Sequence, residues 1–99
     1  MTYATNTIIL ETFDESGQFH SYDDEPALIT VAYSKWFHHG RLHRLDGPAI
    51  EYFDGKKEWV IDNHFCYNKR EFQIAVIKFL LGCSLFAATL INVLVHADD

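Results

Sequence analysis

The sequence is poor in basic residues. Its 99 residues include eight lysines and arginines against fourteen aspartates and glutamates, giving a formal net charge of −6 at pH 7. Proteins that bind phosphate backbones depend on lysine and arginine, so nucleic acid is a poor candidate partner. A small acidic protein is instead steered toward basic patches on other proteins. The acids cluster mainly in two segments with the composition of turns, Asp14–Glu15 and Asp23–Glu25.

Cysteine and catalytic motifs are also scarce. Cys66 and Cys83 are the only cysteines, and the sequence has neither a glycine-rich phosphate loop nor a serine or cysteine nucleophile motif. The N-terminus lacks the basic and long apolar regions of a secretory signal. We therefore expect a cytoplasmic protein with reduced thiols that needs no cofactor.

A spacing of 23 residues runs through the first two-thirds of the chain. It relates an aromatic residue, a turn residue and a histidine or cysteine in three successive units: Phe13, Trp36 and Trp59; Gly17, Gly40 and Asn63; His20, His43 and Cys66. Internal repeats of this kind indicate a chain built from similar supersecondary units. Here the units are short enough to be β-hairpins.

Alternating and β-branched segments separated by turn residues predict the strands. The expected strands are Thr7–Phe13, Gln18–Tyr22, Ala27–Trp36, Arg41–Arg44, Ala49–Phe53, Lys56–Ile61 and His64–Tyr67. Ala27–Trp36 should be the longest, and Asp54–Gly55 is a strong two-residue hairpin signal. Residues 7–67 should thus form an antiparallel meander.

A helix should follow, from about Lys69 to His96. Asn68 and Glu71 have the spacing of a capping box, and Tyr67 and Phe72 that of a hydrophobic staple. Its polar residues form one stripe, which favours a mostly buried helix. A straight helix of this length would be longer than the surface that the meander offers for packing. It should therefore fold back near 82–84 or meet a second copy or a partner.

The same segment allows a membrane interpretation. Residues 74–95 contain one lysine and are long enough to span a bilayer. Basic residues precede this stretch and two aspartates follow it, which fits a tail-anchored topology.

Two groups of residues suggest chemistry. His43, Arg44 and Asp46 lie within four positions, as a small histidine-dependent nuclease would require. However, Asp46 precedes Gly47 and Pro48, which is turn chemistry. A zinc site combining histidines of the Gly40 turn with His64 and Cys66 is a second alternative. Because the repeat already accounts for His43 and Cys66, we expect neither catalytic residues nor a metal site.

Trp36 to Asn63 resembles the MORN-variant repeat of tailed-phage and large-virus proteins. The shared pattern is W-x-x-x-G-x-x-H-R-x-D-G-P-A from Trp36 to Ala49, followed by an Asp-Gly turn and Glu58–Trp59. This resemblance implies β-hairpin units and a small binding module, such as a phage accessory protein acting on a host component. It supplies no catalytic residues.

Together these observations predict one α+β domain over residues 1–99. We expect a non-enzymatic module that binds and inhibits a host defence protein, with a membrane anchor and a nuclease as alternatives. The expected binding residues are Trp36, Trp59, Tyr52, Asp23, Asp24, Glu25, His43, Arg44 and Asp46. A homodimer or partner contact through the helix would use Phe79, Leu80, Phe86 and Leu90.

Overall fold

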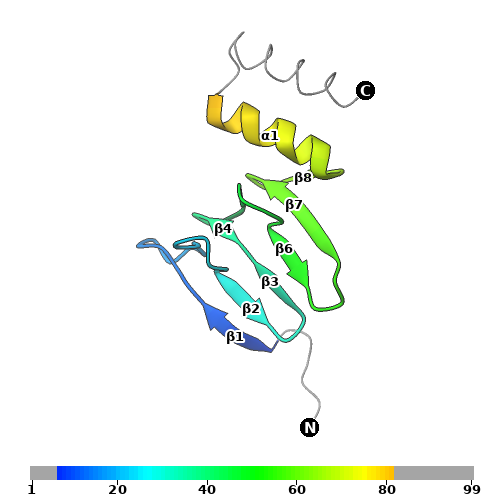
Figure 1. Cartoon of the computed structure of the whole chain (residues 1–99). Coiled ribbons are helices and arrows are strands. Elements are labelled where there is room, and N and C mark those ends of the chain that lie inside the picture. Colours follow the sequence, from blue (N-terminus) through cyan, green and yellow to red (C-terminus); the bar gives the residue numbers. More distant parts are fainter. Residues whose placement is uncertain (1–6, 82–99) are drawn as a thin grey trace.

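The computed structural model describes residues 7–81, which form an antiparallel meander followed by one helix (Figure 1). The strands are β1 (Ile8–Glu11), β2 (Leu28–Thr30), β3 (Tyr33–Lys35), β4 (Phe37–His38), β5 (Arg41–Leu42), β6 (Ile50–Tyr52), β7 (Lys57–Ile61) and β8 (His64–Cys66), and the helix is α1 (Lys69–Leu81). Six strands make one sheet in the order β1-β2-β3-β6-β7-β8, and β4 pairs with β5. The predicted α+β architecture is confirmed.

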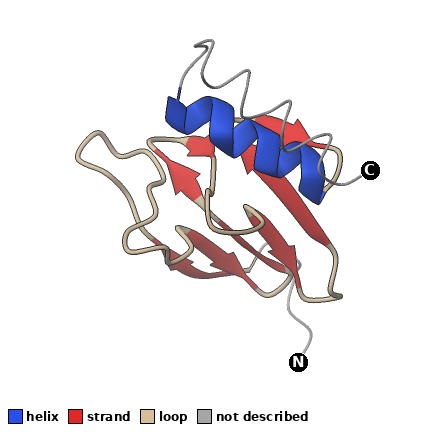
Figure 2. Ribbon diagram, turned by 45° about the horizontal axis from the view of Figure 1, so that its top comes forward, coloured by secondary structure: helices blue, strands red, loops and turns tan. Residues whose placement is uncertain are grey.

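The core is small. It lies partly under helix α1 and partly in the middle of the sheet. Helix α1 contacts β7 and β8 and covers that edge of the sheet (Figure 2). Its Phe72 is buried, as are Val60 and Ile61 on β7. The other buried residues, nearer the middle of the chain, are Ala27, Thr30, Trp36, Ala49 and Ile50. The opposite edge, at β1, is far from this helix.

The predicted long strand Ala27–Trp36 is wrong, because the chain turns back in its middle. Strands β2 and β3 pair antiparallel, with Leu28 opposite Lys35. The side-chain oxygen of Thr30 accepts hydrogen bonds from the amides of Ala32 and Tyr33, at 3.1 and 3.2 Å. A hydroxyl bonded to amides two and three residues later stabilises a turn, and this local contact outweighs the β-propensity of the segment.

The predicted return strand Gln18–Tyr22 is reduced to a single bridge between Phe13 and Phe19. The Phe19 ring lies between those of Phe13 and Phe37, with both pairs of centroids 5.0 Å apart. Backbone hydrogen bonds from the Asp14 amide to the Gln18 carbonyl and from the His20 amide to the Thr12 carbonyl, at 2.8 and 3.1 Å, hold this segment together with the ring stacking.

The helix begins as predicted. The Asn68 side chain accepts a hydrogen bond from the Glu71 amide at 2.9 Å, and the Glu71 carboxylate accepts one from the Tyr67 amide at 2.9 Å. The expected staple does not form, because Tyr67 is 93% exposed while Phe72 is buried against the sheet.

The later part of the predicted helix, with Phe86, Leu90 and the fold-back at 82–84, lies outside the described residues. Within residues 7–81, no helix is both long enough and apolar enough to cross a membrane. Only the start of the predicted span at 74–95 falls in that range.

Candidate binding surface

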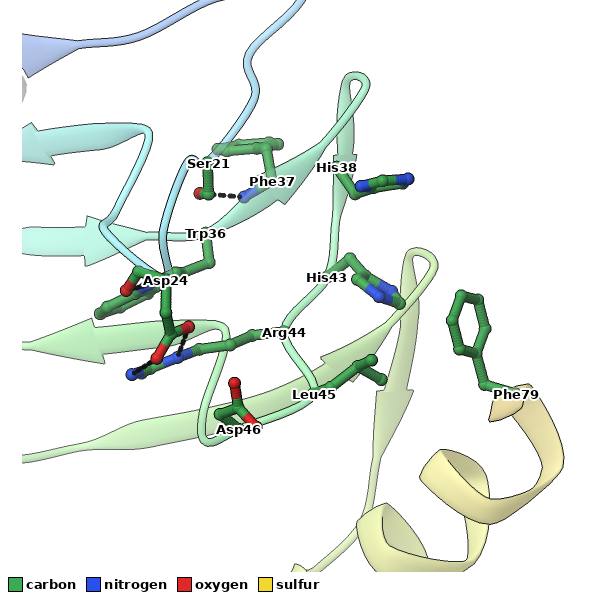
Figure 3. Close-up of a pocket in the computed structure, with 10 residues that line it drawn as sticks. All are labelled: Ser21, Asp24, Trp36, Phe37, His38, His43, Arg44, Leu45, Asp46 and Phe79. Carbon is green, nitrogen blue, oxygen red and sulfur yellow. Dashed lines mark hydrogen bonds and ion pairs between the residues drawn. The ribbon is translucent and has the colours of Figure 1, made fainter. Parts of the chain in front are cut away.

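Six of the predicted site residues meet at one pocket of about 370 Å³ (Figure 3). They are Asp24, Trp36, His43, Arg44, Asp46 and Phe79. Figure 3 shows Asp24, Arg44 and Asp46 at one end, and His38, His43 and Phe79 at the other. The sequence repeat and the last turn of α1 thus contribute to the same depression.

Arg44 is the hub of this pocket. Its guanidinium binds both carboxylate oxygens of Asp24, at 3.0 and 3.1 Å, and also reaches the Pro48 carbonyl and the Glu51 carboxylate, each at 3.1 Å. It lies 3.9 Å from the centroid of the Trp36 ring. These ion pairs keep the pKa of Arg44 above its ordinary value although burial alone would lower it. The arginine is therefore occupied in holding the turn together.

The neighbouring motif residues fit around the same guanidinium. Trp36 is 6% exposed, and its indole N–H donates to the Asp24 carbonyl at 2.9 Å. A side-chain carbon at Gly47 would lie 3.2 Å from an Arg44 nitrogen, tighter than an ordinary contact. Trp36 is thus part of the core, and the tryptophan, arginine and glycine of the motif have packing roles. Asp46, at the rim, is exposed.

His43 braces a hairpin turn. Its Nδ1 accepts a hydrogen bond from the Asp62 amide at 3.1 Å. The same contact occurs 23 residues earlier, where Nδ1 of His20 accepts one from the His39 amide at 3.1 Å. Burial lowers the pKa of both imidazoles, which favours the neutral form that accepts these bonds.

The same spacing recurs in the backbone. The Gly40 amide donates to the Phe19 carbonyl and the Asn63 amide to the Leu42 carbonyl, each at 2.8 Å. Gly17 also lies in this series, and all three turn residues have positive φ, at 83°, 86° and 67°. Glycine and asparagine tolerate that conformation, which explains their recurrence.

A compact group of histidines lies beside the pocket. His20, His38 and His39 have ring centroids 4.2 to 5.1 Å apart, and His38 lies 5.5 Å from His43. His38 and His39 belong to the zinc site considered above as an alternative. The other ligands of that site, His64 and Cys66, lie on β8 near the helix and are not part of this histidine group.

Two predicted aromatic anchors lie within the sheet. Trp59 on β7 is half-buried opposite Cys66. The Tyr52 hydroxyl on β6 donates a hydrogen bond to the Glu58 carboxylate at 3.2 Å. Burial is the main cause that raises the pKa of this phenol, and the contact with Glu58 raises it further. Neither ring is fully open to a partner.

The remaining predicted residues within 7–81 are exposed. Asp23 and Glu25 flank Asp24 in its turn, and Leu80 is 63% exposed at the end of α1. Phe79 is also partly exposed, with its ring centroid 4.8 Å from that of His43. Asp24 divides its carboxylate between solvent and Arg44.

The sequence interpretation missed one exposed apolar surface. We call it the N-terminal edge, and it consists of Ile8, Ile9, Leu10, Phe13 and Tyr22, which are 40 to 61% exposed. Tyr22 is joined to Phe13 by a hydrogen bond from its hydroxyl to the Phe13 carbonyl at 2.9 Å. The available signal was charge: residues 1–34 contain six acids and no lysine or arginine.

Comparison with known proteins gives no relative from which a function could be transferred. No protein-family model, curated protein or solved structure matches the chain. The resemblance to the MORN-variant repeat therefore stays a prediction, and the function has to be argued from the surface itself.

Proposed function

We propose that this chain is a non-enzymatic module that binds another protein through its N-terminal edge. The observation that carries this proposal is the run of exposed apolar side chains on β1, an outermost strand of the sheet. All four residues of β1 are exposed, including Ile9 at 61% and Ile8 at 55%. Exposed apolar patches of this kind mark protein-interaction sites.

The charges around the edge define the partner. Glu11, Glu15, Asp23 and Glu25 are exposed beside it, on β1 and in the two turns that flank Phe13 and Tyr22. A partner with a basic rim around an apolar strip complements both features. The acids would raise the association rate and the apolar side chains would slow dissociation.

The strand geometry supports a mode of contact. Strand β1 pairs with β2 on one side and ends the six-stranded sheet among the residues described. An open sheet edge can accept an extended segment of another protein, with side-chain contacts adding specificity. We propose that the partner is a host defence protein and that binding inhibits it, as the resemblance to phage-type repeats suggests.

The proposal is tested by capture from bacterial lysate with matched variants. The full chain is immobilised through its C-terminus, and the retained proteins are compared for the wild type, Ile9→Asp and Phe53→Asp. Phe53 is 69% exposed and follows β6, which is separated from β1 by β2 and β3 in the sheet, so its variant is the control.

We expect one or a few proteins to be retained by the wild type and by Phe53→Asp, and to be lost with Ile9→Asp. Raising the salt concentration should weaken capture, because added salt screens the attraction between exposed charges. The screening length is already only about 8 Å at physiological ionic strength. Equal capture by Ile9→Asp would refute the proposed surface.

A further inference from the structure

We propose that His20, His38 and His39 form a binding site for a zinc ion. Each residue offers one imidazole nitrogen, and the three nitrogens lie within 4.8 Å of one another. Neutral imidazole is a preferred ligand of zinc, and three histidines with a water in the fourth position are an established coordination set. The inference rests on other residues than the partner site proposed above, although the His20 ring contacts that of Tyr22, with centroids 4.7 Å apart.

The second coordination shell is already in place. Nδ1 of His39 lies 2.6 Å from a carboxylate oxygen of Asp14, whose other oxygen accepts the amides of Ser16 and Gln18 at 2.8 and 3.0 Å. An ionised carboxylate only accepts hydrogen bonds, so in the neutral ring of His39 the proton lies on Nδ1 and Nε2 keeps its lone pair. Carboxylates that orient histidine ligands in this way are common around zinc.

The backbone at His39 is compatible with the site. His39 and Gly40 both have positive φ, at 47° and 86°, and they form the two-residue turn between β4 and β5. Histidine, like asparagine and aspartate, is enriched at positive φ, and Asp62 occupies the same place in the hairpin 23 residues later, with φ of 53°. The turn therefore holds the His38 and His39 side chains on one short hairpin.

His20 is the weakest of the three ligands. Its Nδ1 already accepts the His39 amide, so in the neutral ring the proton is on Nε2. Zinc can bind the Nδ1 lone pair only by replacing that hydrogen bond. His38 and His39 are therefore the principal pair, and both are exposed and able to adjust.

The adjustment is modest. Zinc–nitrogen bonds of about 2.0–2.1 Å in a tetrahedron place ligand nitrogens about 3.3 Å apart. The present limit of 4.8 Å means that the farthest pair closes by about 1.5 Å. Rotation of two exposed imidazoles is sufficient for a movement of this size.

Zinc titration of the full chain, without a histidine tag, tests the site. Affinity is measured by competition with a chromophoric chelator, and we expect one ion per chain. His38→Ala should weaken binding at least tenfold. His39→Asn, which retains a residue that tolerates positive φ, should do the same. Asp14→Asn, which keeps an oxygen for the turn amides, should weaken it about 10–100-fold.

The matched control is His64→Ala, which removes an exposed histidine on β8 outside the group and should leave the affinity unchanged. Circular dichroism of each variant checks that the sheet persists. If zinc is not bound, or if His64→Ala weakens binding as much as His38→Ala, the proposal is overturned.

Discussion

Replacing Arg44 with alanine should destabilise the fold by about 3 kcal/mol. Asp24 and Glu51 are each about two-fifths exposed, so their ion pairs with Arg44 contribute at most about 1 kcal/mol apiece. The hydrogen bond to the Pro48 carbonyl adds about 1 kcal/mol, and the stacking on Trp36 contributes a similar amount, about 1 kcal/mol. Because such terms are not strictly additive, we take about 3 kcal/mol as the expected total.

The change is large for a domain of this size. Small proteins are stable by about 5–15 kcal/mol, and 1 kcal/mol moves the melting temperature of a domain this long by about 4–8 °C. Arg44→Ala should therefore lower it by about 12–24 °C. Arg44→Lys should recover less than half of the loss, since an ammonium group cannot reproduce the two-pronged contact with Asp24.

Urea unfolding followed by tryptophan fluorescence measures the effect, because Trp36 lies directly under the guanidinium. Arg41→Ala is the control. Arg41 is 61% exposed and makes a single pair with Asp62 at 3.2 Å, so its loss should change the stability by less than about 1 kcal/mol. If Arg44→Ala and Arg41→Ala lose similar stability, the structural role assigned to the motif is wrong.

Two further predictions concern the turn inside the predicted long strand and the thiol near the helix. Thr30→Val removes a buried oxygen that accepts hydrogen bonds from the Ala32 and Tyr33 amides, so it should lower the unfolding free energy by about 1–3 kcal/mol. Urea titration measures this change, and an unchanged midpoint would show that the hydroxyl does not stabilise the turn. Burial, and then the charge of Glu71, raise the pKa of the Cys66 thiol. In a Cys83→Ser background, the midpoint of its alkylation rate with pH should lie above that of a free cysteine peptide, and a midpoint at or below the peptide value would refute this. Because the unfolded thiol ionises first, the contribution of Cys66 to stability should be full below the ordinary thiol pKa and should be lost as pH rises from that value through the raised pKa of the folded protein.

Much of the fold followed from local patterns in the sequence. The capping pair Asn68 and Glu71 and most of the alternating strands depend on contacts between near neighbours, and the structure contains them. A turn also forms at Asp54–Gly55, but its loop has three residues, 53–55, where two were predicted, because the Tyr52 amide bonds to the Lys56 carbonyl. The interruption after Thr30 was not predictable, because it depends on one hydroxyl competing with strand propensity. The staple failed because packing on the sheet determines where Phe72 points.

The site was harder to predict than the fold. The spacing of 23 residues indicated which residues recur, but not that His20 and His43 accept the amides of the next hairpin turn. Trp36 was a natural candidate anchor, yet Arg44 covers one face of its ring. The histidines and the tryptophan that the sequence singled out thus contact other residues of the same chain. The N-terminal edge was not predictable, because the exposure of an apolar strand depends on which strand ends the sheet.

Photo-crosslinking from single positions tests the central claim most directly. A benzophenone amino acid is placed at Ile9, at Tyr22 or, as a control, at Phe53, and each full-length protein is irradiated in bacterial lysate. The account predicts that positions 9 and 22 crosslink to the same protein, that salt reduces the yield, and that position 53 gives no such product. Crosslinking of a partner from position 53 with none from positions 9 and 22 would contradict it.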